Sequence, residues 1–170
     1  MKIFLIGYRC TGKTTIGRIL ADRLNHNFLD MDQMIEQRAA STISNIVDSY
    51  GWDYFRQMEK KLLFNIVTKN DVVVSTGGGI VIDPENLIFL NKNGYAIWLD
   101  ADIQTILSRL NSDPLTHSSR PSLTLKNLKE ETKELLEIRR PLYKKAAHFT
   151  IQTDFYTPQE IVTIIERRLP

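Results

Sequence analysis

The feature that most restricts how this chain can fold is the octapeptide at residues 7–14, Gly-Tyr-Arg-Cys-Thr-Gly-Lys-Thr. It fits the pattern G-x-x-x-x-G-K-[ST], and it lies between a short apolar run at 2–6 and a helical pattern at 14–24. In this strand–loop–helix setting, glycines let backbone N–H groups turn toward phosphate oxygens, and the helix N-terminus adds its positive dipole. We therefore expect residues 7–15 to bind a nucleoside triphosphate together with Mg²⁺.

Two side chains of this loop have separate expected tasks. Lys13 is expected to reach the β- and γ-phosphates and stabilise developing charge, and Thr14 is expected to offer its hydroxyl to Mg²⁺. The residues expected to contact the nucleotide are Cys10, Thr11, Gly12, Lys13, Thr14 and Thr15. Cys10 is either an oxidisable thiol at a helix N-terminus or a small residue that the loop tolerates.

The remainder of the chain alternates short apolar runs with helical patterns. This alternation predicts an α/β fold of three layers on a parallel sheet with right-handed crossovers, but it does not determine the strand order. The expected strands are 2–6, 27–30, 71–75, 95–99 and 149–152. The expected helices are 14–24, 31–40, 44–50, 52–68, 83–94, 102–110 and 124–139, with a last helix starting at the capping box 157–160.

Two carboxylates follow the second expected strand. Enzymes with this phosphate loop usually hold Mg²⁺ with an aspartate at the end of a later strand, but the strand at 71–75 ends in Ser-Thr-Gly. Asp30 and Asp32 lie instead at the carboxyl end of the strand at 27–30, where open parallel sheets bind ligands. We expect Asp30 to order Mg²⁺ through water and Asp32 to hold the accepting hydroxyl. The alternative is that one of them only caps the following helix.

The composition limits the classes of partner. The net charge is +2, and Lys and Arg are scattered among Asp and Glu, which argues against a nucleic-acid or membrane-surface protein. No apolar run approaches about 18 residues, so no membrane span is expected. Cys10 is the only cysteine, so no intrachain disulfide can form. We expect one domain over 1–170 that acts as a monomer in the cytoplasm.

The polar segment at about 111–124 has no helical or strand periodicity. A stretch of this kind between two helices is either a mobile lid or an inert surface loop.

Several separated motifs occur together in a fixed order: the phosphate loop at 7–15, Asp30-Met31-Asp32, the segment 51–59 with its Phe-Arg and final Glu, Ser-Thr-Gly-Gly-Gly at 75–79, Arg120-Pro121, and Arg-Arg-Pro-Leu-Tyr at 139–143. The ordered set resembles the shikimate kinase family, a small member of the nucleoside-monophosphate-kinase-like P-loop fold, over nearly the whole chain. The resemblance implies a five-stranded parallel sheet in the order 2-3-1-4-5. It also implies transfer of the γ-phosphoryl group of ATP to the 3-hydroxyl of shikimate, on the route to chorismate and the aromatic amino acids.

The resemblance also implies roles for individual residues. Asp32 would contact the substrate hydroxyls as the candidate base, and the helical segment at about 31–60 would hold much of the acceptor site. The remaining implied acceptor contacts are Arg56, Gly77, Gly78, Gly79 and Arg139. Arg120 would enter with the lid to touch the phosphates, and Arg109 would stack on adenine. A planar guanidinium suits a carboxylate acceptor because it binds it through two parallel hydrogen bonds.

Some assignments have competing interpretations. Arg56 and Glu59 are spaced as an i,i+3 surface pair, and either Arg139 or Arg140 could simply complement a helix dipole. We choose Arg139 because the family arginine lies two residues before Pro-Leu-Tyr. Trp52 stands where the family commonly has Glu, and 153–156 lacks the Arg or Gln with which relatives often touch the nucleotide.

The sequence is also compatible with other functions. A kinase of the same fold for another small metabolite, such as gluconate kinase, is one alternative. A nucleoside monophosphate kinase fits less well, because paired carboxylates suit a polyol better than a phosphate. A non-catalytic nucleotide-dependent switch is the alternative from another class, and the set Lys13, Thr14 and Asp32 argues against it.

Overall fold

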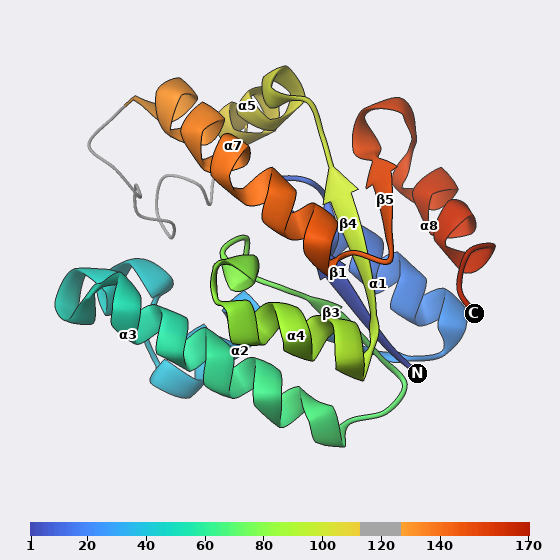
Figure 1. Cartoon of the computed structure of the whole chain (residues 1–170), viewed down its shortest axis with the longest axis horizontal. Coiled ribbons are helices and arrows are strands. Elements are labelled where there is room, and N and C mark those ends of the chain that lie inside the picture. The colour runs from blue at the N-terminus through green and yellow to red at the C-terminus, as the bar shows by residue number, and fades with distance from the viewer. Residues whose placement is uncertain (113–126) are drawn as a thin grey trace.

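A computed structural model describes residues 1–112 and 127–170 of the chain (Figure 1). Its centre is a five-stranded sheet in which every pairing is parallel and the order is β2-β3-β1-β4-β5. The predicted fold class and the strand order implied by the resemblance are therefore confirmed. The strands are β1 (Lys2–Ile6), β2 (Asn27–Asp30), β3 (Val72–Ser75), β4 (Tyr95–Asp100) and β5 (Phe149–Gln152).

Helices cover both faces of this sheet because side chains of each buried strand alternate between the two faces. The long helices are α1 (Lys13–Leu24), α3 (Ile43–Asn65), α4 (Pro84–Asn93), α5 (Ile103–Ser112) and α7 (Leu128–Ala146). The shorter elements are α2 (Met31–Ala39), α8 (Pro158–Glu166) and the 3-10 turns Ile66–Thr68, Ile80–Ile82 and Thr153–Phe155. In β1, Ile3 and Leu5 pack under α1 and α8, whereas Phe4 and Ile6 pack in the cluster with α3, α4 and α7.

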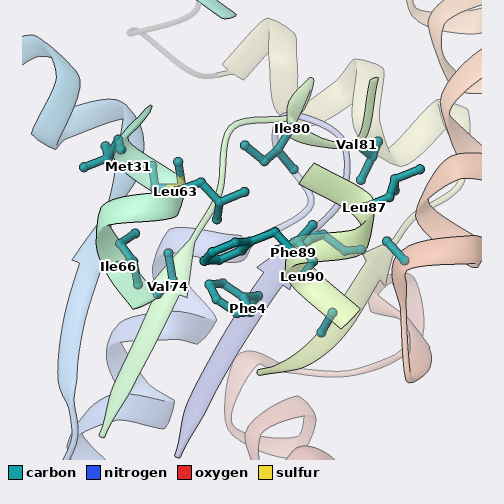
Figure 2. Close-up of a cluster of buried hydrophobic side chains, with 14 of the residues drawn as sticks. Phe4, Met31, Leu63, Ile66, Val74, Ile80, Val81, Leu87, Phe89 and Leu90 are labelled. Atoms are coloured by element: carbon teal, nitrogen blue, oxygen red, sulfur yellow. The ribbon is translucent and has the colours of Figure 1, made fainter. Parts of the chain in front are cut away.

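The larger core cluster lies between the sheet and the helices α3 and α4. Figure 2 shows Phe4 and Val74 from the strands meeting Leu63 from α3 and Phe89 from α4. The rings of Phe4 and Phe89 meet edge to face with centroids 6.3 Å apart. This packing holds α3 rigidly against the sheet, so a functional side chain carried by α3 has a defined position.

Two helix boundaries differ from expectation. The expected helices at 44–50 and 52–68 correspond to two arms of α3 that meet at Gly51, whose φ of 82° and ψ of 169° interrupt the helix. The second arm ends at Asn65, and residues 66–68 form a 3-10 turn. The helix expected to end at Arg139 continues to residue 146, so that prediction was wrong. It continues through Pro141 because that residue lies on the exposed face, where water can bond the freed carbonyl, while Tyr143 and Ala146 are fully buried beyond it.

Part of one expectation lies beyond the described residues. The lid expected at 111–124 begins in the last turn of α5, and its residues from 113 onward, including Arg120, are outside the described ranges. None of the helices in the described ranges is long and apolar enough to cross a membrane.

The sheet brings the sequence motifs to one edge. Ser75 at the end of β3 pairs with Asp30 of β2 on one side and with Leu5 of β1 on the other. The phosphate loop follows β1, so it emerges between the end of β3 and the end of β4. This is the place where the strand order reverses, and ligands of open parallel sheets bind there.

The kink in α3 gives a stability prediction. The backbone angles of Gly51 lie in a region that is essentially restricted to glycine, and a Cβ there would meet nothing within 4 Å. We expect Gly51→Ala to lower the free energy of unfolding by about 1–3 kcal/mol, through backbone conformation alone. Urea denaturation measures this, with Gln57→Ala on the exposed face of α3 as a control that should change stability by less than about 0.5 kcal/mol. Equal stability of Gly51→Ala and wild type would contradict the kink.

Candidate active site

A cavity of about 540 Å³ opens at the carboxyl ends of β1, β2 and β3. Most of the predicted site residues line it: Cys10, Gly12, Lys13, Thr14, Thr15, Asp30, Asp32, Arg56, Gly77, Gly78, Gly79 and Arg139. Thr11 is not among the lining residues that the structure describes, because its buried hydroxyl donates to the Tyr8 carbonyl oxygen at 2.9 Å. The structure thus brings the nucleotide motif and the acceptor motifs into one space.

The phosphate loop has the backbone that an anion site needs. Gly7, Cys10 and Gly12 all have positive φ, which turns successive peptide groups of the loop. A Cβ on Gly7 would lie 2.3 Å from the Leu99 carbonyl oxygen, so only glycine lets the loop start so close to β4. The ammonium of Lys13 donates to the Gly7 and Tyr8 carbonyl oxygens at 2.9 and 2.7 Å. The loop is therefore closed on its own lysine at the base of α1.

Asp30 performs two tasks at once. One carboxylate oxygen accepts from the backbone N–H groups of Asp32 and Gln33, at 3.1 and 3.3 Å, and caps α2. The other accepts from the Thr14 hydroxyl at 2.8 Å. The capping interpretation and the ligand-site interpretation of Asp30 are thus both compatible with this structure, since each uses a different oxygen.

These oxygens fit the needs of Mg²⁺. The ion usually keeps several waters and binds one or two protein oxygens together with substrate phosphates. Thr14 and Asp30 supply a hydroxyl and a carboxylate beside the phosphate loop, and the Ser75 hydroxyl lies 3.5 Å from that of Thr14. Among residues 1–112 and 127–170, no group of three or more His, Cys, Asp or Glu could hold a metal alone.

Arg56 is held from several sides on the acceptor side of the cavity. Its guanidinium donates to Glu59, which is 1% exposed, and it lies 5.2 Å and 5.3 Å from the ring centroids of Trp52 and Phe55. A Cβ on Gly79 would lie 2.3 Å from the guanidinium carbon. The i,i+3 pair is therefore real, but it is part of the cavity and not a surface pair.

The two carboxylates of the acceptor side converge on Gly77. A Cβ on that glycine would lie 2.0 Å from Glu59 Oε1 and 3.1 Å from Asp32 Oδ1. Burial, with a smaller contribution from the negative charge of Asp32, raises the pKa of Glu59 to about 7, against the lowering effect of Arg56 and Arg139. This part of the cavity therefore combines two acids and two guanidinium groups at close range.

The adjacent arginines of α7 point to different places. Arg139 is 5% exposed, donates to the Gly78 carbonyl oxygen at 3.3 Å and lies over the ring of Tyr8. Arg140 donates to the Ala101 carbonyl oxygen at 2.9 Å and to Asp100 at 3.4 Å, at the end of β4. Of the two, Arg139 lines the cavity in the described part of the chain.

Arg109 lies beside the phosphate loop but is not one of the described lining residues of the cavity. Its guanidinium donates to the Cys10 carbonyl oxygen at 3.2 Å and to the Thr153 hydroxyl at 3.3 Å. It therefore connects the loop to the segment after β5, where Phe155 and Tyr156 are exposed.

The comparisons with known proteins agree on one family. A family model described as shikimate kinase matches residues 9–170. The shikimate kinase of Sulfurihydrogenibium sp. is 39% identical over 170 residues, covering 98% of each chain. The chain belongs to the shikimate kinase family. The solved shikimate kinase of Acinetobacter baumannii, in complex with shikimate, is 32% identical with a TM-score of 0.90, covering 99% of this chain and 95% of that one. The enzyme of Aquifex aeolicus is 35% identical with a TM-score of 0.83, covering 98% and 95%.

Some lining residues of this shikimate kinase family member were not assigned a role from the sequence. The sequence showed Glu59 as the final Glu of the motif at 51–59 and as a spacing partner of Arg56, but nothing in the sequence shows that this side chain is buried. Phe55 belongs to the larger core cluster and Trp52 packs against it, and both also line the cavity and flank Arg56. Arg9 also lines the cavity, and its position in the loop gave no signal beyond a variable residue of the motif.

The pKa of Glu59 predicts a pH dependence of stability. Its folded pKa of about 7 lies above the ordinary value of 4.5, so the folded state binds the extra proton between these values. Stability contributed by protonated Glu59 is complete below about pH 4.5 and is lost as the pH rises through about 7. We expect the unfolding free energy of wild type, relative to Glu59→Gln, to fall across that window.

Urea titrations at intervals from pH 4.5 to 8 measure this difference. Glu137→Gln, on the exposed face of α7, controls for loss of one carboxylate. A difference between wild type and Glu59→Gln that stays constant with pH would contradict the raised pKa.

Proposed function

We propose that this protein transfers the γ-phosphoryl group of ATP to the 3-hydroxyl of shikimate, as an enzyme of aromatic amino acid biosynthesis. The observation that supports this proposal most directly is that two half-sites line the same cavity. The phosphate loop with Thr14 and Asp30 forms one half, and Asp32, Arg56 and Arg139 form the other. Membership of the shikimate kinase family and the similarity to a solved relative in complex with shikimate support this assignment.

The nucleotide half holds the triphosphate by charge and by oriented N–H groups. Backbone N–H groups of residues 10–15 and the N-terminus of α1 face the phosphates, and Lys13 exchanges its carbonyl partners for phosphate oxygens. Thr14 and Asp30 would hold Mg²⁺ beside the phosphates, Thr14 with its hydroxyl and Asp30 with its carboxylate. When bound, Mg²⁺ neutralises charge on the phosphate oxygens.

The acceptor half orients a small carboxylated polyol. Arg139 and the outer N–H groups of Arg56 bind the carboxylate, and the backbone of 77–79 lies against the ring. Asp32 accepts a hydrogen bond from the 3-hydroxyl and thereby orients the hydroxyl oxygen toward the γ-phosphate. Phosphoryl transfer has a loose transition state, so orientation and charge neutralisation contribute more than the basicity of Asp32. As the bond between the 3-oxygen and the γ-phosphorus forms, the bond from that phosphorus to the β–γ bridging oxygen breaks and ADP leaves, while the hydroxyl proton passes to Asp32.

The remaining parts of the proposal concern the periphery of the site. Arg120 supplies a further cation to the phosphates from the segment 111–124, acting as a lid that excludes water. Arg109 contacts the adenine, consistent with its bond to the loop at Cys10. The chain works as one domain over 1–170, as a cytoplasmic monomer, with the segment 31–60 carrying much of the acceptor site. The gluconate kinase and switch alternatives have no comparable support.

A panel of acceptors tests the function directly. ADP release is coupled to a spectrophotometric assay with ATP, Mg²⁺ and one acceptor at a time: shikimate, gluconate or a nucleoside monophosphate. Turnover that depends on shikimate, and is absent with Lys13→Ala, is expected. Equal ADP release with and without shikimate would refute the assignment.

The adjacent arginines of α7 provide a matched pair of variants. Arg139→Lys keeps the charge but loses the planar fork, so we expect the KM for shikimate to rise about tenfold or more, with the KM for ATP within about twofold of wild type. Arg140→Lys should leave both constants within about twofold, because Arg140 contacts the end of β4 outside the cavity. An unchanged shikimate KM in Arg139→Lys would show that Arg139 does not bind the carboxylate.

A further inference from the structure

A largely buried ion pair joins the phosphate loop to α7. The Arg9 guanidinium lies 2.5 Å from Glu131 in the first turn of α7, and the two side chains are 12% and 1% exposed. The residues are 122 positions apart in the sequence. This contact therefore ties the loop to a helix from the other end of the chain.

The pair is strongly constrained by its surroundings. Burial acts to lower the pKa of Arg9, yet its pKa lies above the ordinary value because Tyr8 and Glu131 outweigh burial. The Arg9 guanidinium also lies 3.5 Å from the Tyr8 hydroxyl and 5.6 Å from the centroid of the Tyr8 ring. A cation that is shielded from water and lacks a counter-charge has a high free energy, so the Arg9 guanidinium remains in contact with the Glu131 carboxylate.

The same face of α7 also holds the glycine loop of the acceptor half. Arg139 and the Tyr143 hydroxyl both donate to the Gly78 carbonyl oxygen. Glu131, Arg139 and Tyr143 are all buried, and at 1.5 Å per residue Glu131 lies about 12 Å along the helix from Arg139. One helix thus contacts both loops between which the phosphoryl group must pass.

We propose that Glu131 is a positioning residue: through Arg9 it fixes the phosphate loop on α7, and so aligns the nucleotide half with the acceptor half. The loop needs such a support because Cys10, with a φ of 61°, has a backbone conformation that is sparsely populated for residues other than glycine, and the glycines at 7 and 12 restrain the backbone little. Phosphate binding by this loop depends on the orientation of its backbone N–H groups. A loop that is not fixed on α7 would lose this orientation. The part of this proposal that concerns alignment of the two half-sites rests on the proposed function. The part that concerns nucleotide binding by the phosphate loop does not.

The first experiment measures binding of Mg²⁺–ADP and of shikimate by calorimetry to purified variants of the full chain. We expect Glu131→Gln to raise the Kd for Mg²⁺–ADP about tenfold and to leave the Kd for shikimate within about twofold. Glu131→Asp, which keeps the charge, should recover most of the nucleotide affinity. Glu130→Gln is the matched control, because Glu130 lies in the same turn but is exposed, and it should bind both ligands like wild type.

The second experiment tests whether Glu131 acts through Arg9. In a double-mutant cycle with Arg9→Gln, adding Glu131→Gln should worsen the Kd for Mg²⁺–ADP by less than about twofold. Melting temperatures of all variants separate loss of folding from loss of affinity. A lower melting temperature for Glu131→Gln with wild-type nucleotide affinity would mean a structural role only, and additive effects in the cycle would likewise overturn the proposal.

The double-mutant cycle remains informative if one single variant folds poorly. Glu131→Gln leaves the Arg9 cation without its carboxylate partner, whereas the double variant lacks that cation as well. If Glu131→Gln is not folded, Glu131→Asp against wild type and the double variant against Arg9→Gln answer the same question. Absence of shikimate-dependent turnover in wild type would refute the proposed function, while the Mg²⁺–ADP comparison would still decide the role of Glu131.

Discussion

The close packing of the glycine loop at 77–79 is the constraint on which the site depends. A Cβ on Gly77 would collide with Glu59, one on Gly79 would collide with Arg56, and one on Gly78 would lie 3.4 Å from the backbone of Arg9. At Gly77 and Gly79 the places that side chains would normally fill are thus occupied by charged groups of the acceptor half, and at Gly78 the phosphate loop lies at van der Waals distance. Because the loop has no side chains, the two half-sites can meet across a single turn of backbone.

This packing also determines how charge is distributed. Arg56 and Glu59 form an ion pair next to Gly79, whereas Arg139 approaches the loop from α7 and donates to the Gly78 carbonyl oxygen. The glycine carbonyl therefore orients a guanidinium without neutralising it. A bound carboxylate can offset that charge in a way that a carbonyl dipole cannot, which suits this half of the cavity to an anionic acceptor.

The sequence was sufficient for the phosphate loop, the carboxylates after β2 and the alternating layers, because each depends on local pattern. The strand order came from the family resemblance, since periodicity does not determine which strands are neighbours. The end of α7 was misplaced because Pro141 is a local signal for a helix end, and the buried Tyr143 and Ala146 outweigh it. Tertiary burial of this kind has no local signature.

The same distinction applies within the site. Asp30 could be placed because the end of a parallel strand is a predictable location, but the burial of Glu59 depends on where α3 docks against 77–79. The pair of Arg9 and Glu131 depends on how α7 crosses the sheet, and no spacing rule connects residues so distant in sequence. Local chemistry was thus readable, whereas contacts between segments were not.

The protonation of Glu59 connects burial to recognition. Burial and the nearby Asp32 favour its protonated form, and Arg56 and Arg139 favour its charged form, so the two tendencies nearly balance at neutral pH. When Glu59 is charged, it neutralises Arg56; when it is protonated, both guanidinium groups retain their positive charge for an anion. An incoming carboxylate and the Glu59 carboxylate therefore compete for the same cation. Binding of an anionic acceptor and protonation of Glu59 would therefore favour each other, because the acceptor brings in a negative charge and protonation removes the one that would repel it.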